Sequence, residues 1–365
     1  MEPFWSERFG NPASLHSHGL KVRDAMAAAR AQIAALINAP SSEEIIFTSD
    51  GTESMNLAIK GVAWANESRG RHIVISTIEH PGIEQAVRFL EHHGFACTRV
   101  PVDNEGMIRP SDFAEAITNE TLLVATHHVN HDLGTIQPVA EIGALVAEHG
   151  IPFYVDAEAS AGWCKIDLLQ MHASLLSLSP QRFGGPKGVG ALYRSRRVPL
   201  TPLIHGGNQE GGLRAGIENV AGIVGAGIAA EIAGRELVAT QGHVGRLQAH
   251  LWKGIQEKIP HVRLNGPPPG PNRAPNALNI SIEFLEGEGI ALACDLKGLA
   301  IASGSACQGK SLKIPPALAA IGLSPELARA NVILSMARQT TEQEITDAME
   351  ILAKTVERLR DMSDS

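Results

Sequence analysis

The chain has 365 residues, of which 44% are hydrophobic and 19% are charged, so it can bury a substantial core in more than one domain. Its net charge of -8 argues against general nucleic-acid binding, which needs a basic surplus. No uninterrupted apolar stretch approaches the roughly 18 residues that a membrane span needs. The N-terminus lacks the basic start and apolar run of a signal peptide, and we therefore expect a cytoplasmic protein.

Strands and helices are predicted in alternation along the first half of the chain. Apolar residues recur at helical spacing over residues 17–38, which predicts an amphipathic helix. Short apolar runs predict strands at 44–47, 72–77, 121–126, 151–157, 173–179 and 188–194. Helical patterns separate several of these strands, at 55–65, 83–94 and 138–150. Such alternation is typical of a largely parallel sheet with helices on both faces.

A proline- and glycine-rich stretch over residues 265–281 interrupts this alternation. A long helical pattern, roughly 218–259, precedes it. A further strand and two helices follow, at 277–284, 288–298 and 341–362. We place a domain boundary near residue 236. The expected organisation is a large α/β domain over 1–236, N-terminal arm included, and a smaller α+β domain over 237–365.

Polar motifs follow five of the predicted strands. In chain order they read "TSDGTES", "STIEH", "HHVNHDLGT", "VDAEAS" and "SPQRFGGPKG". Ligands of open parallel sheets bind beyond the carboxyl ends of the strands, so these motifs together predict one pocket. The first motif also opens a helix, whose backbone N–H groups can hold an anion.

Several longer motifs carry a family resemblance. They are "FGNPASLHSHG", "ISTIEHPGIEQ", "GTIQPV", "GGPKGVGALY", "LRAGIENVAGIVG" and "IASGSAC". With them the chain resembles the NifS/IscS-like cysteine desulfurases, pyridoxal phosphate (PLP) proteins of the class V aminotransferase family. The resemblance implies PLP fold type I: a mostly parallel seven-stranded sheet with helices on both faces, and a smaller α+β C-terminal domain. It also implies a homodimer.

The resemblance places an arginine where the family has its cofactor-anchoring lysine. The family's Ser-x-His-Lys turn reads Ser179, Pro180, Gln181 and Arg182 here. An imine needs a primary amine with a free lone pair, which a permanently protonated guanidinium lacks. Arg182 therefore cannot anchor the cofactor. Lys187, in the nearby Gly-Pro-Lys-Gly segment, is the one alternative anchor we consider.

Other positions that the resemblance assigns to the pocket are also substituted. A glutamine is replaced by Ala159, an asparagine by His131, the carboxylate-binding arginine by Ile333, and a phosphate-binding threonine by Ile217. Asp50 stands where the phosphate turn usually has glycine. Two like charges about 4 Å apart repel by on the order of 4 kcal/mol at an effective dielectric near 20.

The retained family positions are Thr52, His80, Asp156 and Ser179. In relatives the histidine stacks on the pyridine ring and the aspartate pairs with its nitrogen. Asp156 also has a structural interpretation, as a partner of Arg182 or as the cap of a turn. Because unpaired buried charge is costly, the substitutions predict that PLP binds weakly or not at all.

The four cysteines include one candidate for chemistry. The sequence has no CxxC pair, which argues against a structural zinc site, and Cys97, Cys164 and Cys294 are interpreted as small buried residues with free thiols, as expected in a reducing compartment. Cys307 matches the family's loop cysteine, which carries a persulfide to a partner, and its alternative is a buried loop cysteine. Lys310 and Lys313 lie close to it in sequence, and cations favour the thiolate.

A metal site is not predicted. His127, His128 and His131 form an HHxxH cluster, but neighbouring residues of a strand point to opposite faces. Metal chemistry is therefore limited to Cys307 as a ligand of an iron–sulfur cluster on a scaffold protein.

Three functions remain open. The favoured one is a cysteine desulfurase relative with a degenerate PLP pocket, a pseudoenzyme acting through Cys307 in sulfur relay or in iron–sulfur or thio-cofactor assembly. Its partner would be an iron–sulfur scaffold or another sulfur acceptor. The second is an active PLP enzyme with altered chemistry, using non-covalent PLP or Lys187. The third is a protein that binds another ligand in the old pocket.

Overall fold

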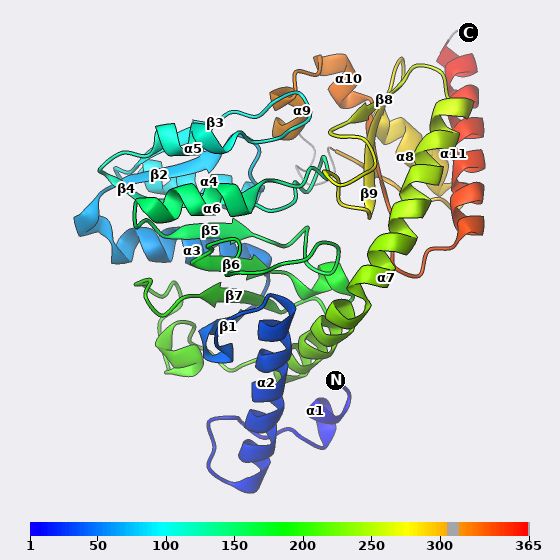
Figure 1. Cartoon of the computed structure of the whole chain (residues 1–365). Coiled ribbons are helices and arrows are strands. Elements are labelled where there is room, and N and C mark those ends of the chain that lie inside the picture. Colours follow the sequence, from blue (N-terminus) through cyan, green and yellow to red (C-terminus); the bar gives the residue numbers. More distant parts are fainter. Residues whose placement is uncertain (305–313, 364–365) are drawn as a thin grey trace. The chain divides into compact units, whose positions relative to one another are not determined.

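The computed structural model describes residues 1–304 and 314–363 (Figure 1). They form two compact units. Unit 1 comprises Met1–Val100, Arg109–His128 and Pro138–Leu237. Unit 2 comprises Pro101–Ile108, Val129–Gln137 and the described residues from Val238 onward. The C-terminal unit thus begins at Val238, and it also takes in two segments from earlier in the chain.

Unit 1 is built on a seven-stranded sheet, which confirms the predicted α/β class. The strand order is β1-β7-β6-β5-β4-β2-β3, and β7 alone runs antiparallel to its neighbours. The strands are β1 (Ile45–Thr48), β2 (His72–Ser76), β3 (Ala96–Val100), β4 (Thr121–His127), β5 (Phe153–Asp156), β6 (Leu175–Leu178) and β7 (Gly190–Arg194). Five of them are buried along their whole length, as expected of strands covered on both faces: β1, β2, β4, β5 and β6.

Helices cover both faces of this sheet (Figure 1). One face carries the pair α3 and α4, and the other carries the pair α5 and α6. The first six α-helices of the chain belong to unit 1 and are α1 (Pro3–Ser6), α2 (Ser17–Leu36), α3 (Gly51–Ala65), α4 (Pro81–Glu91), α5 (Pro110–Ala116) and α6 (Val139–Glu148). The short 3-10 helices are η1 (Ser42–Glu44), η2 (Glu67–Arg69), η3 (Pro180–Phe183) and η4 (Gln209–Gly212). Fully buried Met55 and Ile59 of α3 pack with Ile73 and Leu123 of the sheet.

Unit 2 contains an antiparallel sheet of four strands in the order β10-β11-β9-β8. They are β8 (Val262–Asn265), β9 (Ala277–Ile282), β10 (Ala302–Ser303) and β11 (Asn331–Ser335). The helices are α8 (Gly287–Asp295), α9 (Pro316–Ala320), α10 (Pro325–Arg329) and α11 (Glu342–Ser363). This is the α+β composition predicted for the C-terminal part.

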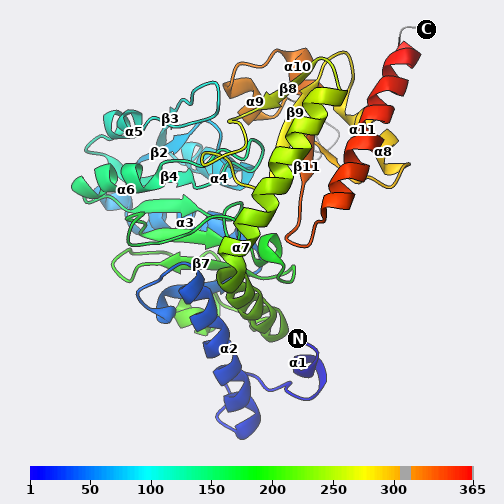
Figure 2. The same ribbon diagram turned by 45° about the vertical axis from the view of Figure 1, so that its right-hand side comes forward.

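One continuous helix, α7 (Val220–Lys258), passes from unit 1 into unit 2. Figures 1 and 2 both show α11 alongside its C-terminal half. Gly254 allows this approach, because a side chain there would overlap Met349 of α11. Among the helices of the described residues, none combines the length and the apolar character that crossing a membrane requires.

Candidate functional site

The carboxyl ends of four parallel strands in unit 1 carry four of the five predicted polar motifs, and the fifth follows β4 and continues into unit 2. β1 leads into the start of α3, β2 into His80, β5 ends at Asp156, and β6 leads into η3. Because β1, β2, β5 and β6 run in the same direction, these ends share one edge of the sheet.

Asp50 caps the N-terminus of α3. Its Oδ1 accepts a hydrogen bond of 2.7 Å from the backbone N of Glu53, and Glu53 Oε2 accepts one of 2.7 Å from the backbone N of Ser49. The two bonds satisfy the backbone N–H of Glu53 in the first turn of α3 and that of Ser49 just before the cap. Asp50 and Thr52 are both exposed. A negative charge is therefore fixed at the turn that the sequence had suggested for an anion.

Glu158 lies within the predicted polar motif "VDAEAS", although no role was assigned to it from the sequence. Its carboxyl group lies against Gly51, so that a Cβ built on that glycine would overlap Cδ and both carboxyl oxygens. Glu158 is only 9% exposed, and its Oε1 has no hydrogen-bond partner in the described parts of the chain. The first turn of α3 is thus covered by a buried carboxyl group.

Burial is the main reason that the pKa of Glu158 rises from 4.5 to about 9. The charges of Asp156 and Asp50 raise this pKa further, and that of Arg182 opposes them. At neutral pH Glu158 is therefore an uncharged carboxylic acid. This uncharged state was not predicted from the sequence.

Asp156 ends β5 and caps the turn that follows it. Its Oδ1 accepts hydrogen bonds from the backbone N of Glu158, at 2.9 Å, and from Ser177 Oγ, at 3.2 Å. Tyr154 OH lies 2.7 Å from the same Ser177 Oγ. Burial, and then the nearby Asp156 charge, raise the pKa of Tyr154 well above its ordinary value. The turn-capping interpretation of Asp156 matches these contacts.

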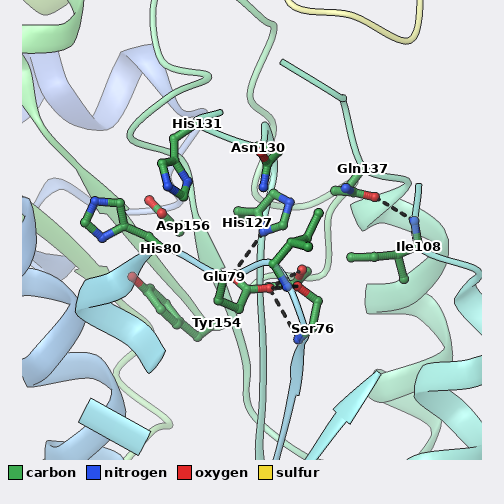
Figure 3. Close-up of polar contacts among 12 residues, drawn as sticks. Ser76, Glu79, His80, Ile108, His127, Asn130, His131, Gln137, Tyr154 and Asp156 are labelled. Atoms are coloured by element: carbon green, nitrogen blue, oxygen red, sulfur yellow. Dashed lines mark hydrogen bonds and ion pairs between the residues drawn. The ribbon is translucent and has the colours of Figure 1, made fainter. Parts of the chain in front are cut away.

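His80 and Glu79 follow β2 and are held by different partners. His80 caps α4, and its Nδ1 accepts a hydrogen bond of 3.0 Å from the backbone N of Gly82. Glu79 is buried and accepts from Ser76 Oγ and from Thr126 Oγ1, the latter at 2.9 Å. His127 Nδ1 lies 3.1 Å from Glu79 Oε2 (Figure 3). This network joins the end of β2 to the end of β4.

The turn that carries Arg182 where the family has its cofactor-anchoring lysine forms η3. Arg182 is exposed, its backbone N donates to Ser179 O at 2.9 Å, and its carbonyl accepts from Trp163 Nε1 at 3.3 Å. Ser179 is buried, whereas Gln181 and Lys187 are exposed. The guanidinium charge of Arg182 lowers the pKa of Glu158, against the larger effect of burial.

Ala159 and Ile217 also belong to unit 1. Ala159 is half-buried in the turn after Asp156, and Ile217 is 72% exposed in the segment before α7. In unit 2, Ile333 lies on β11 opposite Asn279, and His131 Nε2 lies 3.6 Å from Asp132 Oδ2.

The cysteines with described positions are free thiols. Cys164 and Cys294 are buried and Cys97 is half-buried. Burial raises the pKa of Cys97 and that of Cys164 to about 12, so both remain protonated at neutral pH. Cys307, the candidate for chemistry, lies outside the described residues. Within 1–304 and 314–363, no group of three or more His, Cys, Asp or Glu side chains is placed to hold a metal ion.

Comparisons with known proteins agree with one another. Residues 1–347 match the family model described as Aminotransferase class-V. The chain is 41% identical to cysteine desulfurase IscS of Dictyoglomus turgidum and 43% identical to that of Clostridium botulinum, in each case over 363 residues. Both matches cover 100% of this chain and 91% of the relative.

Solved structures show the same likeness. A NifS-like protein matches with a TM-score of 0.91 and 31% identity, covering 98% of this chain and 94% of that one. A structure described as SspA in complex with cysteine matches with a TM-score of 0.80 and 35% identity, covering 93% and 94%. The sheet of unit 1 and the smaller C-terminal unit therefore match PLP fold type I.

Proposed function

The chain belongs to the NifS/IscS-like cysteine desulfurases of the class V aminotransferase family, and from this premise we propose that it transfers sulfur through Cys307 while its PLP pocket is degenerate. PLP is the cofactor of this family. The single observation that carries the proposal is the pair of carboxyl groups, Asp50 and Glu158, at the start of α3.

The residues at this helix start do not suit a phosphate group. Anions bind helix N-termini through backbone N–H groups that approach them directly. Here Asp50 accepts a hydrogen bond from a first-turn N–H group, that of Glu53, and the carboxyl group of Glu158 covers Gly51. A phosphate would have to displace the uncharged carboxyl group of Glu158 and lie close to the charge of Asp50.

Arg182 supports the same conclusion from the other end of the cofactor. Its guanidinium stays protonated and offers no lone pair for a carbon–nitrogen double bond. The side chain is exposed, in a 3-10 turn held by its backbone. The proposed sulfur chemistry therefore belongs to the thiol of Cys307 alone.

The proposed relay requires a persulfide donor and no external oxidant. The Cys307 thiolate attacks the outer sulfur atom of the donor persulfide, a new S–S bond forms, and the donor's S–S bond breaks. The donor leaves as a thiolate, and an acceptor thiolate then takes the sulfur from Cys307 in the same way. We expect a homodimer, and an iron–sulfur scaffold or another sulfur acceptor as partner.

Mass spectrometry of the intact chain tests this relay. After incubation with glutathione persulfide, Cys307 should gain one sulfur atom, and addition of an acceptor thiol should remove it. Cys97 serves as the internal control, because burial keeps it as a thiol. The Cys307→Ser variant should gain no sulfur. An unmodified Cys307 under conditions that modify free glutathione would refute the relay.

A further inference from the structure

We propose that the carboxyl group of Glu158 plugs the anion cradle at the start of α3 and thereby excludes phosphate monoesters from the wild-type protein. The cradle consists of Asp50, Gly51 and Thr52. This inference deepens the proposed function, on which it rests for the family of ligands excluded. It names one residue as the determinant of what the pocket rejects.

The geometry places the plug where a ligand would have to come. Glycine at position 51 leaves the backbone of the first turn open to close approach, and the Glu158 carboxyl group occupies that opening. Position 51 does not have a left-handed backbone that would by itself demand glycine. A side chain at position 51 would therefore meet the carboxyl group of Glu158 and would not be opposed by a left-handed backbone.

The position of Glu158 is itself fixed by its own turn. The backbone N of Glu158 donates to Asp156 Oδ1 at 2.9 Å, which holds the start of the side chain at the end of β5. At 9% exposure, the carboxyl group has little room to turn toward solvent. A bound phosphate would thus require either removal of this side chain or rearrangement of the Asp156 turn.

The chemistry of the plug is unusual for a buried acid. Oε1 is buried without a hydrogen-bond partner among the described residues, an arrangement that native proteins rarely keep without a reason. Because burial raises the pKa of Glu158 to about 9, the group is neutral at pH 7. It can therefore cover the helix N-terminus without placing an unpaired charge in the interior. Asp50, Asp156 and Arg182 are the charged groups that act on it. The exclusion is therefore mainly steric.

Titration calorimetry of the full-length protein tests the plug directly. The probes are inorganic phosphate and pyridoxine 5′-phosphate, which has no aldehyde and cannot react with lysines. In Glu158→Ala both should bind at least about tenfold more tightly than in the wild type, a change of about 1.4 kcal/mol. Glu158→Gln, which keeps the volume of the side chain, should show no gain. Glu43→Ala makes the same glutamate-to-alanine change at an exposed position and should also show none.

Two results would overturn the proposal. One is wild-type affinity for phosphate equal to that of Glu158→Ala, and the other is an equal gain in Glu158→Gln. Neither result concerns persulfide formation on Cys307, so failure of the plug and failure of the relay are observed separately.

A thermodynamic cycle tests the contact even if the alanine variant is too unstable for titration. Gly51→Ala should lower the melting temperature clearly in the wild-type background, since the new methyl group meets Glu158. In a Glu158→Ser background the same substitution should cost little. Equal losses in both backgrounds would show that the carboxyl group does not cover Gly51.

Discussion

Arg30 of α2 and Glu210 of η4 form a bidentate ion pair. Arg30 Nη1 lies 2.7 Å from Glu210 Oε2, and Nη2 lies 2.7 Å from Oε1. Glu210 Oε2 also accepts a hydrogen bond of 2.8 Å from the backbone N of Phe47 in β1. The side chain of Glu210 is only 3% exposed. The pair therefore ties the segment before α7 to the first strand of the sheet.

Glu210→Ala should destabilise the protein by about 3 kcal/mol, because it leaves a largely buried guanidinium and a backbone N–H without their partner. Thermal or urea unfolding measures this loss. Arg23→Ala, an exposed arginine of the same helix, should stay within about 0.5 kcal/mol of the wild type. Equal stability of Glu210→Ala and Arg23→Ala would contradict the importance of this pair.

Asp50 has a structural role that is separable from its charge. Asp50→Ala removes the cap on the backbone N of Glu53 and should cost about 1 kcal/mol, while Asp50→Ser retains a capping oxygen and should cost a few tenths at most. Urea unfolding of the two variants gives the comparison. If the serine variant lost as much stability as the alanine variant, the carboxylate would matter for more than capping.

Much of the fold was predictable because its strands have a simple environment. β1, β2, β4, β5 and β6 are buried on both faces, and such strands read as apolar runs. The edge strand β3 was not predicted from the sequence pattern. Its first four residues alternate between exposed and half-buried, with Arg99 paired to Glu91, so its sequence has no apolar run. The seventh strand was expected only from the family resemblance.

The candidate site was predictable in position but not in chemistry. His80 and Asp156 were found because polar residues directly after parallel strands share one edge. Glu158 was noted only as part of the motif after β5, because its significance depends on the approach of its side chain to Gly51, which is distant in sequence. A signal was present in the letters "VDAEAS", where a carboxylate follows a predicted buried strand, but no local pattern shows which helix it covers.

The purified wild-type protein should be colourless after incubation with PLP, and it should release no sulfide from cysteine. The physical reason is the absence of an amine at Arg182 together with the covered helix start. Visible absorption after gel filtration measures retention of the cofactor. A stoichiometric yellow colour that disappears in Lys187→Ala would contradict the proposal and favour the alternative anchor.

Arg182→Lys alone should remain nearly colourless, since the new amine does not open the start of α3. The double variant Arg182→Lys/Glu158→Ala should retain visibly more PLP than either single variant, and the effect should exceed the sum of the two. Arg182→Gln/Glu158→Ala is the matched control, because it opens the cradle without supplying an amine. Full colour in Arg182→Lys alone would show that Glu158 does not limit cofactor binding.

The stability of the protein should depend on the protonation of Glu158. In the unfolded chain this carboxyl group loses its proton near pH 4.5, whereas in the folded protein burial keeps its pKa at about 9. Between these values the folded state binds the proton and the unfolded state does not, so the contribution of this group to stability falls as pH rises. It is fully present below pH 4.5 and is lost by about pH 9.

Glu158→Gln removes this titration while keeping the shape of the side chain. The melting temperature of Glu158→Gln minus that of the wild type should therefore increase steadily from pH 5 to pH 9. Glu43→Gln makes the same change at an exposed position and shows what replacing one glutamate by glutamine does without burial. A difference that stays constant across this range would mean that Glu158 ionises at its ordinary pKa. Its carboxyl group would then have to be reached by water or by a cation, which its burial against Gly51 argues against.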